Sequence, residues 1–149
     1  QITMADNTTK NIEKIVKDDW IMTFDDKANK LAKTQVSGLI LTRHSNLLKL
    51  KFPDREISTT DDHPFWTEGK NWASLNPDKS NKNYHQNTPI KQLVVGDKIF
   101  VPAENKFLTL LETENIAPEQ LTYTIELISG NNFIANGLLV KTEKPKWIN

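Results

Sequence analysis

Thr60 and His63 are the residues whose types and spacing could do chemistry in this chain. His63 offers an imidazole that titrates near neutral pH, and Thr60, three residues earlier, offers a hydroxyl that can donate and accept hydrogen bonds. Residues 56–60 are rich in the β-branched side chains typical of strands, and Pro64 disfavours a helix at His63. The sequence therefore predicts a strand ending at Thr60 and a turn that presents both side chains for general acid–base chemistry.

Less specific interpretations of this region stay open. A histidine beside a proline is often a capping or packing residue in a turn. Asp61 and Asp62 could suggest calcium, but a Ca²⁺ site usually takes six or more spaced oxygen ligands, so a solvated loop is expected here. His44 and His85 stand apart from His63 in the sequence. We therefore expect no metal and no cofactor.

The composition argues against several classes of function. Nineteen Lys and Arg residues balance nineteen Asp and Glu residues among 149, so neither nucleic acid nor an anionic membrane is expected as a partner. No apolar run approaches the roughly 20 residues that cross a bilayer. The lack of cysteine excludes disulfides and leaves the compartment open. Trp66 and Trp72 could stack on a sugar, but neighbouring tryptophans usually pack in a core or its rim. We expect a single domain and a monomer.

Two segments of the chain are similar to each other. Residues 12–21 align without a gap on residues 90–99. Identical residues occupy four of the aligned positions: Ile12 and Ile90, Val16 and Val94, Asp19 and Asp97, and Ile21 and Ile99. Such self-similarity predicts two pseudo-symmetric halves that share one core. The alternative is a coincidence between two turns that each lead into a strand.

Alternating apolar and polar residues predict strands elsewhere. They cover residues 34–43, 46–52, 123–128 and 133–140, the last with a tight turn at Asn136–Gly137. Residues 107–112 could form a strand or a short helical turn. Residues 76–87 are polar, rich in turn formers and without periodicity, so we expect an irregular surface loop there.

The segment from Thr60 and His63 through Pro64, Phe65 and a turn at Gly69 resembles the second sequence block of the Hint superfamily. That superfamily contains inteins, hedgehog autoprocessing domains and bacterial intein-like modules. Residues 1–25 resemble its first block, and residues 123–140 its last blocks. The resemblance implies an all-β, pseudo-two-fold horseshoe of antiparallel strands with little helix. It also implies a Hint-like domain at residues 1–142, with residues 143–149 as a tail or linker.

For function, the resemblance implies self-processing. Thr60 and His63 would polarise a peptide bond just upstream of the domain, so the substrate and partner would be the chain's own flanking polypeptide. The nucleophile would precede Gln1, so residues 1–149 alone are expected to be inert. About twenty residues separate Val101 from Tyr123, whereas a compact domain needs about 50. We therefore expect no inserted endonuclease.

The chain departs from the family pattern at several positions. Asn7 and Asp18 stand where glycine is usual, and Asn131 stands where histidine is common. Lys141 and Thr142 stand where a histidine–asparagine pair would support cleavage at the C-terminal junction. Lys141 is a poor acid near pH 7, and Thr142 has no amide that could attack its own carbonyl. We therefore expect neither splicing nor C-terminal cleavage.

Two other hypotheses come from different classes. The chain could be a degenerate Hint domain that serves as a structural or binding module in a larger bacterial or phage protein. It could also be an unrelated small β-barrel or sandwich that binds peptide or sugar, with an exposed aromatic patch.

Overall fold

The computed structural model describes residues 1–44, 47–84, 88–116 and 120–142, with the backbone alone for residues 42–44 and 120–121. In this part of the chain the strands form one sheet of nine strands and two sheets of three. The large sheet contains β1 (Ile2–Thr3), β2 (Thr9–Lys10), β7 (Phe65–Thr67), β8 (Asn71–Ser74), β9 (Lys91–Gln92), β10 (Lys98–Val101), β11 (Lys106–Thr109), β14 (Asn132–Ala135) and β15 (Leu138–Lys141).

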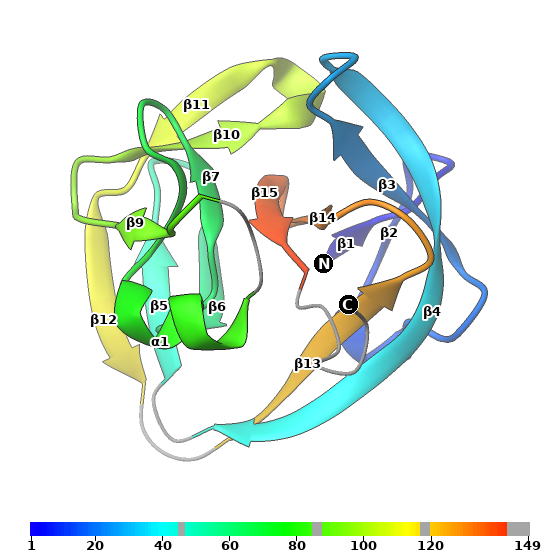
Figure 1. Cartoon of the computed structure of the whole chain (residues 1–149), viewed down its shortest axis with the longest axis horizontal. Helices are drawn as coiled ribbons and strands as arrows, with labels where there is room; N and C mark the ends of the chain where they lie inside the picture. The colour runs from blue at the N-terminus through cyan, green and yellow to red at the C-terminus, as the bar shows by residue number, and fades with distance from the viewer. Residues whose placement is uncertain (45–46, 85–87, 117–119, 143–149) are drawn as a thin grey trace.

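The two smaller sheets flank the central strands. One contains β5 (Leu47–Lys51), β6 (Glu56–Thr60) and β12 (Glu112–Ile116), and the other β3 (Trp20–Asp25), β4 (Lys30–His44) and β13 (Gln120–Leu127). Figure 1 shows β14 and β15 in the middle, with these sheets on opposite sides. Paired strands run antiparallel, except β8 with β9. The expected all-β fold is confirmed.

The first of the two similar segments folds into a tight turn before β3. The carboxylate of Asp19 accepts hydrogen bonds from the backbone N–H of Val16 (3.1 Å) and from the ammonium of Lys10 (2.8 Å). Asp18, in the turn, has a φ of 76°, and its N–H donates to the carbonyl of Val36 (2.8 Å). The backbone at Asp18 is therefore left-handed, a conformation that glycine adopts most easily.

The second segment repeats this turn before β10. The carboxylate of Asp97 accepts hydrogen bonds from the N–H of Val94 (2.9 Å) and the ammonium of Lys70 (2.8 Å). Gly96 has a φ of 101°, and its N–H donates to the carbonyl of Leu110 (2.8 Å). The aligned segments thus make equivalent hydrogen bonds. The domain boundary at residue 142 stays a prediction.

One apolar core joins the two segments. Ile21 and Ile99, which are aligned in sequence, are both fully buried, and Ile15 and Leu93 are 2% and 1% exposed. All four belong to one cluster of buried side chains. At about 25 cal/mol per Å² of apolar surface, burial of such side chains is the main stabilisation of both turns.

The expected strands are confirmed, with small differences in length. The strand expected at residues 34–43 is the middle of the fifteen-residue β4. For residues 107–112 the sequence allowed a strand or a short helical turn. Residues 107–109 belong to β11 and residue 112 begins β12, so the prediction of a strand was the correct one. Asn136 and Gly137 have φ values of 50° and 80°, as a tight turn between β14 and β15 requires.

The expected irregular loop at residues 76–87 was wrong in its first part. Residues Pro77–Asn83 form the helix α1, and residues 85–87 lie outside the described residues. The side chain of Asn76 accepts a hydrogen bond from the N–H of Lys79 and caps the helix, and Pro77 suits the first helical position. The described residues also contain two 3₁₀ turns, η1 (Ile12–Lys14) and η2 (Pro102–Glu104).

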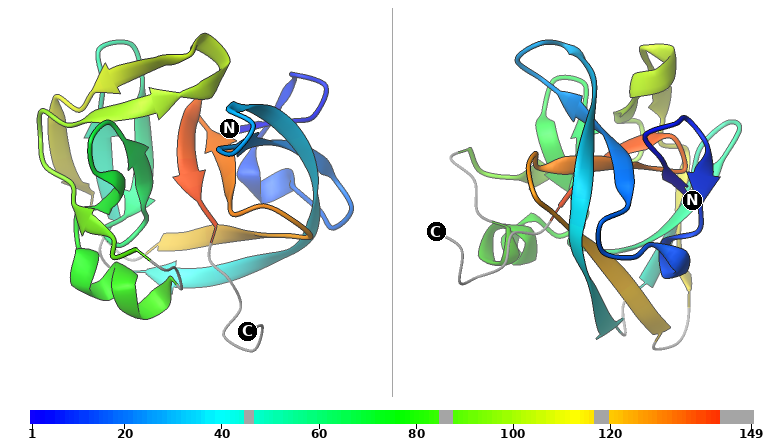
Figure 2. Two further views of the ribbon diagram at one scale, coloured as in Figure 1. Left: turned by 45° about the horizontal axis from the view of Figure 1, so that its top comes forward. Right: turned by 90° about the vertical axis from the view of Figure 1, so that its right-hand side faces the viewer.

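Figure 2 shows α1 on the outer side of the strands. In the described ranges, no helix is long and apolar enough to cross a membrane.

We expect the Asp97→Ala and Asp19→Ala variants each to lower the free energy of unfolding by about 1–2 kcal/mol, because each loses a backbone and a lysine donor. Urea denaturation measures this change. Glu68→Ala, which removes an exposed carboxylate, is the control and should stay within about 0.5 kcal/mol of the parent. An Asp97→Ala variant as stable as Glu68→Ala would show that the turn does not depend on this carboxylate.

Candidate active site in the turn between β6 and β7

The turn between β6 and β7 holds both residues predicted from the sequence. Thr60 is the last residue of β6, and the N–H of His63 donates to the carbonyl oxygen of Thr60 over 3.5 Å. The carbonyl of the next residue, Pro64, accepts a hydrogen bond from the N–H of Lys141 in β15 (3.1 Å). The turn therefore brings the two residues together and joins them to a central strand of the large sheet.

Three aromatic rings pack around the imidazole of His63, one from the adjacent strand β7 and two from more distant parts of the chain. Ring centroids lie at 5.9 Å for Phe65, 6.1 Å for Tyr84 and 6.4 Å for Phe133. The Nε2 atom of His63 is buried and has no hydrogen-bond partner among the residues that the structure describes. A buried polar atom without a partner costs free energy, and a functional role is one explanation for such an atom.

The surroundings keep the imidazole of His63 neutral. Burial lowers its pKa from 6.5 to about 4, although the charge of Asp62 and a backbone hydrogen bond with Lys141 act to raise it. At pH 7 the ring is therefore uncharged, so it can accept a proton or donate a hydrogen bond. Once protonated in this site, it would be a stronger acid than an exposed histidine.

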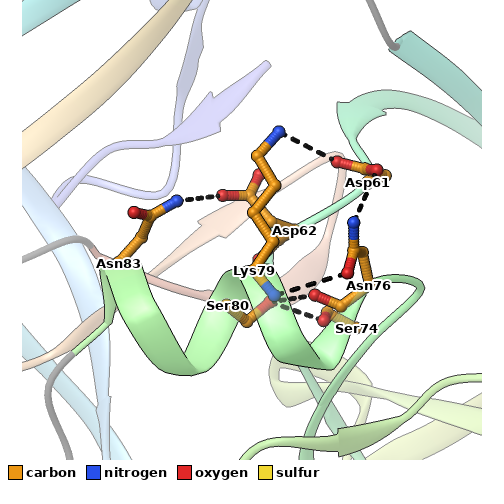
Figure 3. A network of polar contacts seen from close by, with 7 residues as sticks. All are labelled: Asp61, Asp62, Ser74, Asn76, Lys79, Ser80 and Asn83. Carbon is orange, nitrogen blue, oxygen red and sulfur yellow. Dashed lines mark hydrogen bonds and ion pairs between the residues drawn. The ribbon is translucent and has the colours of Figure 1, made fainter.

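Asp62, the residue before His63, is bonded to the helix α1, as Figure 3 shows for its contact with Asn83. Its carboxylate accepts hydrogen bonds from the side-chain amide of Asn83 (2.9 Å) and from the hydroxyl of Thr60. Burial acts to raise the pKa of Asp62, but the bonds from Asn83 and Thr60, the charge of Lys79 and that of His63 when protonated outweigh it, and the pKa is lowered. A charged carboxylate thus lies next to a neutral imidazole.

Sequence reasoning missed the residues that α1 contributes to the site. Ser80, Asn83 and Tyr84 all contact the turn that carries His63. The available signal was the pair Asn76–Pro77, a capping residue followed by a proline at the first helical position. It predicts a helix, but not the side on which the helix packs.

The other candidate sites receive no support. Asp61 bonds through its carboxylate to two side chains at the start of α1, and no group of three acidic or histidine side chains in the described ranges could hold a metal ion. Trp66 and Trp72 pack against each other at 5.1 Å and against a small core cluster. The side chain of His44 and the whole of His85 lie outside the described residues.

Both described ends of the chain reach the central strands. The amino group of Gln1 donates to the side-chain oxygen of Asn136 (2.6 Å), in the turn between β14 and β15. At the other end, the backbone of Lys141 makes a hydrogen bond with the imidazole of His63. The ammonium of Lys141 lies over the ring of Trp72, 5.2 Å from the centroid. The lysine charge is thus directed to a tryptophan.

The lowered pKa of His63 predicts a loss of stability in mild acid. Below pH 6.5 the unfolded chain binds a proton at this residue and the folded chain does not until about pH 4, so the free energy of unfolding falls as the pH falls. The slope is about 1.4 kcal/mol per pH unit. Between pH 6.5 and 5 the parent should lose about 2 kcal/mol more than His63→Phe, which keeps an aromatic ring but cannot titrate.

Urea denaturation of both proteins at the two pH values measures this difference, because every other titrating group is common to the pair. Equal losses in the parent and in His63→Phe would show that the imidazole is solvated in the folded protein.

Comparison with known proteins places this geometry in context. The family model of the AXH module, described as the ataxin-1 and HBP1 module, matches residues 1–104. The comparison with curated proteins gives no match. Among solved structures, a bacterial intein-like domain from Clostridium thermocellum is 18% identical with a TM-score of 0.75, and the similarity covers 95% of this chain and 92% of that one.

Two inteins give the same result. The DnaB intein from Synechocystis sp. PCC 6803 is 19% identical with a TM-score of 0.73, covering 95% of this chain and 92% of its own. The gp41-1 intein is 18% identical with a TM-score of 0.71, covering 95% and 93%. At such identities the similarity shows the fold, and it confirms the Hint-like architecture rather than an unrelated barrel or sandwich. By the family model that matches residues 1–104, the chain belongs to the AXH family, and its fold is that of the bacterial inteins.

Proposed function

We propose that this domain is a self-processing module that activates a peptide bond upstream of Gln1. The observation that carries the proposal is the buried Nε2 of His63, which lacks a partner in the described structure and lies in the same turn as Thr60. An unsatisfied ring nitrogen is suited to bond a peptide group or a nucleophile that enters from the flanking chain.

The reaction would be an acyl shift followed by cleavage. A hydroxyl or thiol on the residue after the scissile bond attacks the carbonyl carbon, so a carbon–oxygen or carbon–sulfur bond forms and the carbon–nitrogen bond breaks. His63 takes the proton of the nucleophile and returns it to the leaving nitrogen, which becomes the new amino group. Water or an added thiol then releases the upstream segment from the ester.

The electrostatics of His63 favour the second of these proton transfers. A pKa of about 4 makes the imidazolium a strong acid toward the leaving nitrogen, although it makes the neutral ring a weak base. The hydroxyl of Thr60 donates a hydrogen bond to the carboxylate of Asp62. The threonine oxygen therefore keeps acceptor capacity, and Thr60 would orient an N–H group of the substrate.

The C-terminal half of a splicing reaction is not part of the proposal. Thr142 is buried and its N–H donates to the carbonyl of Asn131 (2.8 Å), but its side chain has no amide to cyclise. The ammonium of Lys141 lies over Trp72. Neither residue supplies the nucleophile or the acid that cleavage at that junction needs.

A decayed domain that acts as a structural or binding module is the second candidate. The observation in its favour is the enclosure of the imidazole by the rings of Phe65, Tyr84 and Phe133. Such packing also suits a histidine that has become a core residue, and it would then leave the upstream peptide bond intact.

The test is expression of the protein with its natural upstream residues and an N-terminal tag, followed by mass measurement with and without dithiothreitol. We expect release of the tagged segment and a fragment that begins at the nucleophile. His63→Ala should slow release by roughly 10²–10⁴-fold, the usual contribution of general acid–base catalysis.

Glu68→Ala, which removes an exposed side chain in the turn after β7, is the control and should cleave at the parental rate. An upstream segment that stays attached under both conditions would eliminate self-processing and leave the structural module.

A further inference from the structure

The helix α1 has only seven residues, which is too short to be stable alone in water. Its contacts must therefore hold it in place. Ser80 and Asn83 are spaced at i and i+3, so they lie on one side of the helix. That side faces the turn between β6 and β7, which carries the candidate active site. Tyr84 follows the helix in an extended conformation, and its ring contacts the ring of His63.

Ser80 and Asn83 both bond to Asp62 (Figure 3). The hydroxyl of Ser80 donates to the backbone carbonyl of Asp62, and it also lies 2.6 Å from the hydroxyl of Ser74 in β8. Ser80 is fully buried. The amide of Asn83 donates to the carboxylate of Asp62 at 2.9 Å. The helix thus holds both the backbone and the side chain of Asp62, the residue before His63.

A second anchor fixes α1 to the following strand. Asn81 exchanges two hydrogen bonds with the backbone of Ile90, at 2.8 Å and 3.1 Å. Ile90 is buried in the segment that leads to β9. The helix is therefore held on two sides, so a displacement of the turn that carries His63 would strain both sets of bonds.

We propose that α1 is the positioning element of the candidate active site and that Asn83, acting through Asp62, is a positioning residue for His63 and Thr60. This inference rests on the proposed function for its catalytic consequence. The carboxylate of Asp62 accepts from Asn83 and from Thr60. The amide of Asn83 directs the carboxylate of Asp62 toward the helix, and the carboxylate in turn fixes the hydroxyl of Thr60 by its hydrogen bond.

Without that amide, the carboxylate of Asp62 would lose a donor and turn toward other partners. The groups that face the imidazole are the carboxylate of Asp62, the rings of Phe65, Tyr84 and Phe133, and the backbone of Lys141. Of these, only the carboxylate carries a negative charge. A freed carboxylate would attract the imidazolium more strongly and would release the hydroxyl of Thr60 from its present orientation.

The experiment compares Asn83→Ala with Lys82→Ala, an exposed neighbour on the same helix. The first measurement is the pKa of His63 by NMR of the imidazole nitrogens. The second is the cleavage rate of the protein with its upstream residues. We expect Asn83→Ala to raise the pKa of His63 and to slow cleavage about tenfold or more, because small displacements of catalytic groups are costly. Lys82→Ala should change neither.

Asn83→Asp is the second variant, for the case that Asn83→Ala unfolds in urea assays. It keeps the shape of the side chain, and its carboxylate faces that of Asp62, so the same changes should be larger. Parental pKa and parental cleavage in the folded Asn83 variants would overturn the proposal, and so would a raised pKa with parental cleavage. If the parent does not cleave, the proposed function fails, and the pKa of His63 alone decides whether Asn83 positions the imidazole.

Discussion

The pairing of β15 with β7 is the constraint on which the rest of the structure depends. Val140 pairs with Phe65, and the N–H of Lys141 donates to the carbonyl of Pro64. These bonds join the end of the described chain to a turn more than seventy residues earlier in the sequence. Because that turn carries His63, the pairing fixes the imidazole beside the central strands.

Burial at this junction has opposite effects on stability and on chemistry. Enclosing an imidazole whose Nε2 has no partner in the described structure costs stability. The same enclosure depresses the pKa, and a substrate atom that bonded to the buried Nε2 would do so in surroundings less polar than water, where hydrogen bonds are stronger. In a purely structural site the unpaired nitrogen only costs stability, whereas the proposed self-processing would use it.

Local patterns in the sequence predicted the strands and the turns, because alternation and residues with positive φ act over a few positions. Asn136–Gly137 is the clearest case. The same reasoning failed at α1. This helix has no amphipathic pattern in its sequence, because Ser80 is its one buried residue. Its stability comes from bonds to Asp62 and Ile90, which are distant in sequence. The aromatic enclosure of His63 was equally hidden, since Tyr84 and Phe133 come from separate elements.

The candidate site lies where the two halves differ. Both halves contain the turn with an aspartate that binds a backbone N–H and a lysine, and this shared unit serves the core. Before the second copy, the chain adds α1, and Asn81 bonds that helix to Ile90 at the start of the repeated segment. The added helix thus spans from the repeat to the turn that carries His63. In a fold built from two similar units, a site with a single imidazole requires such a local departure from symmetry, and α1 is part of that departure.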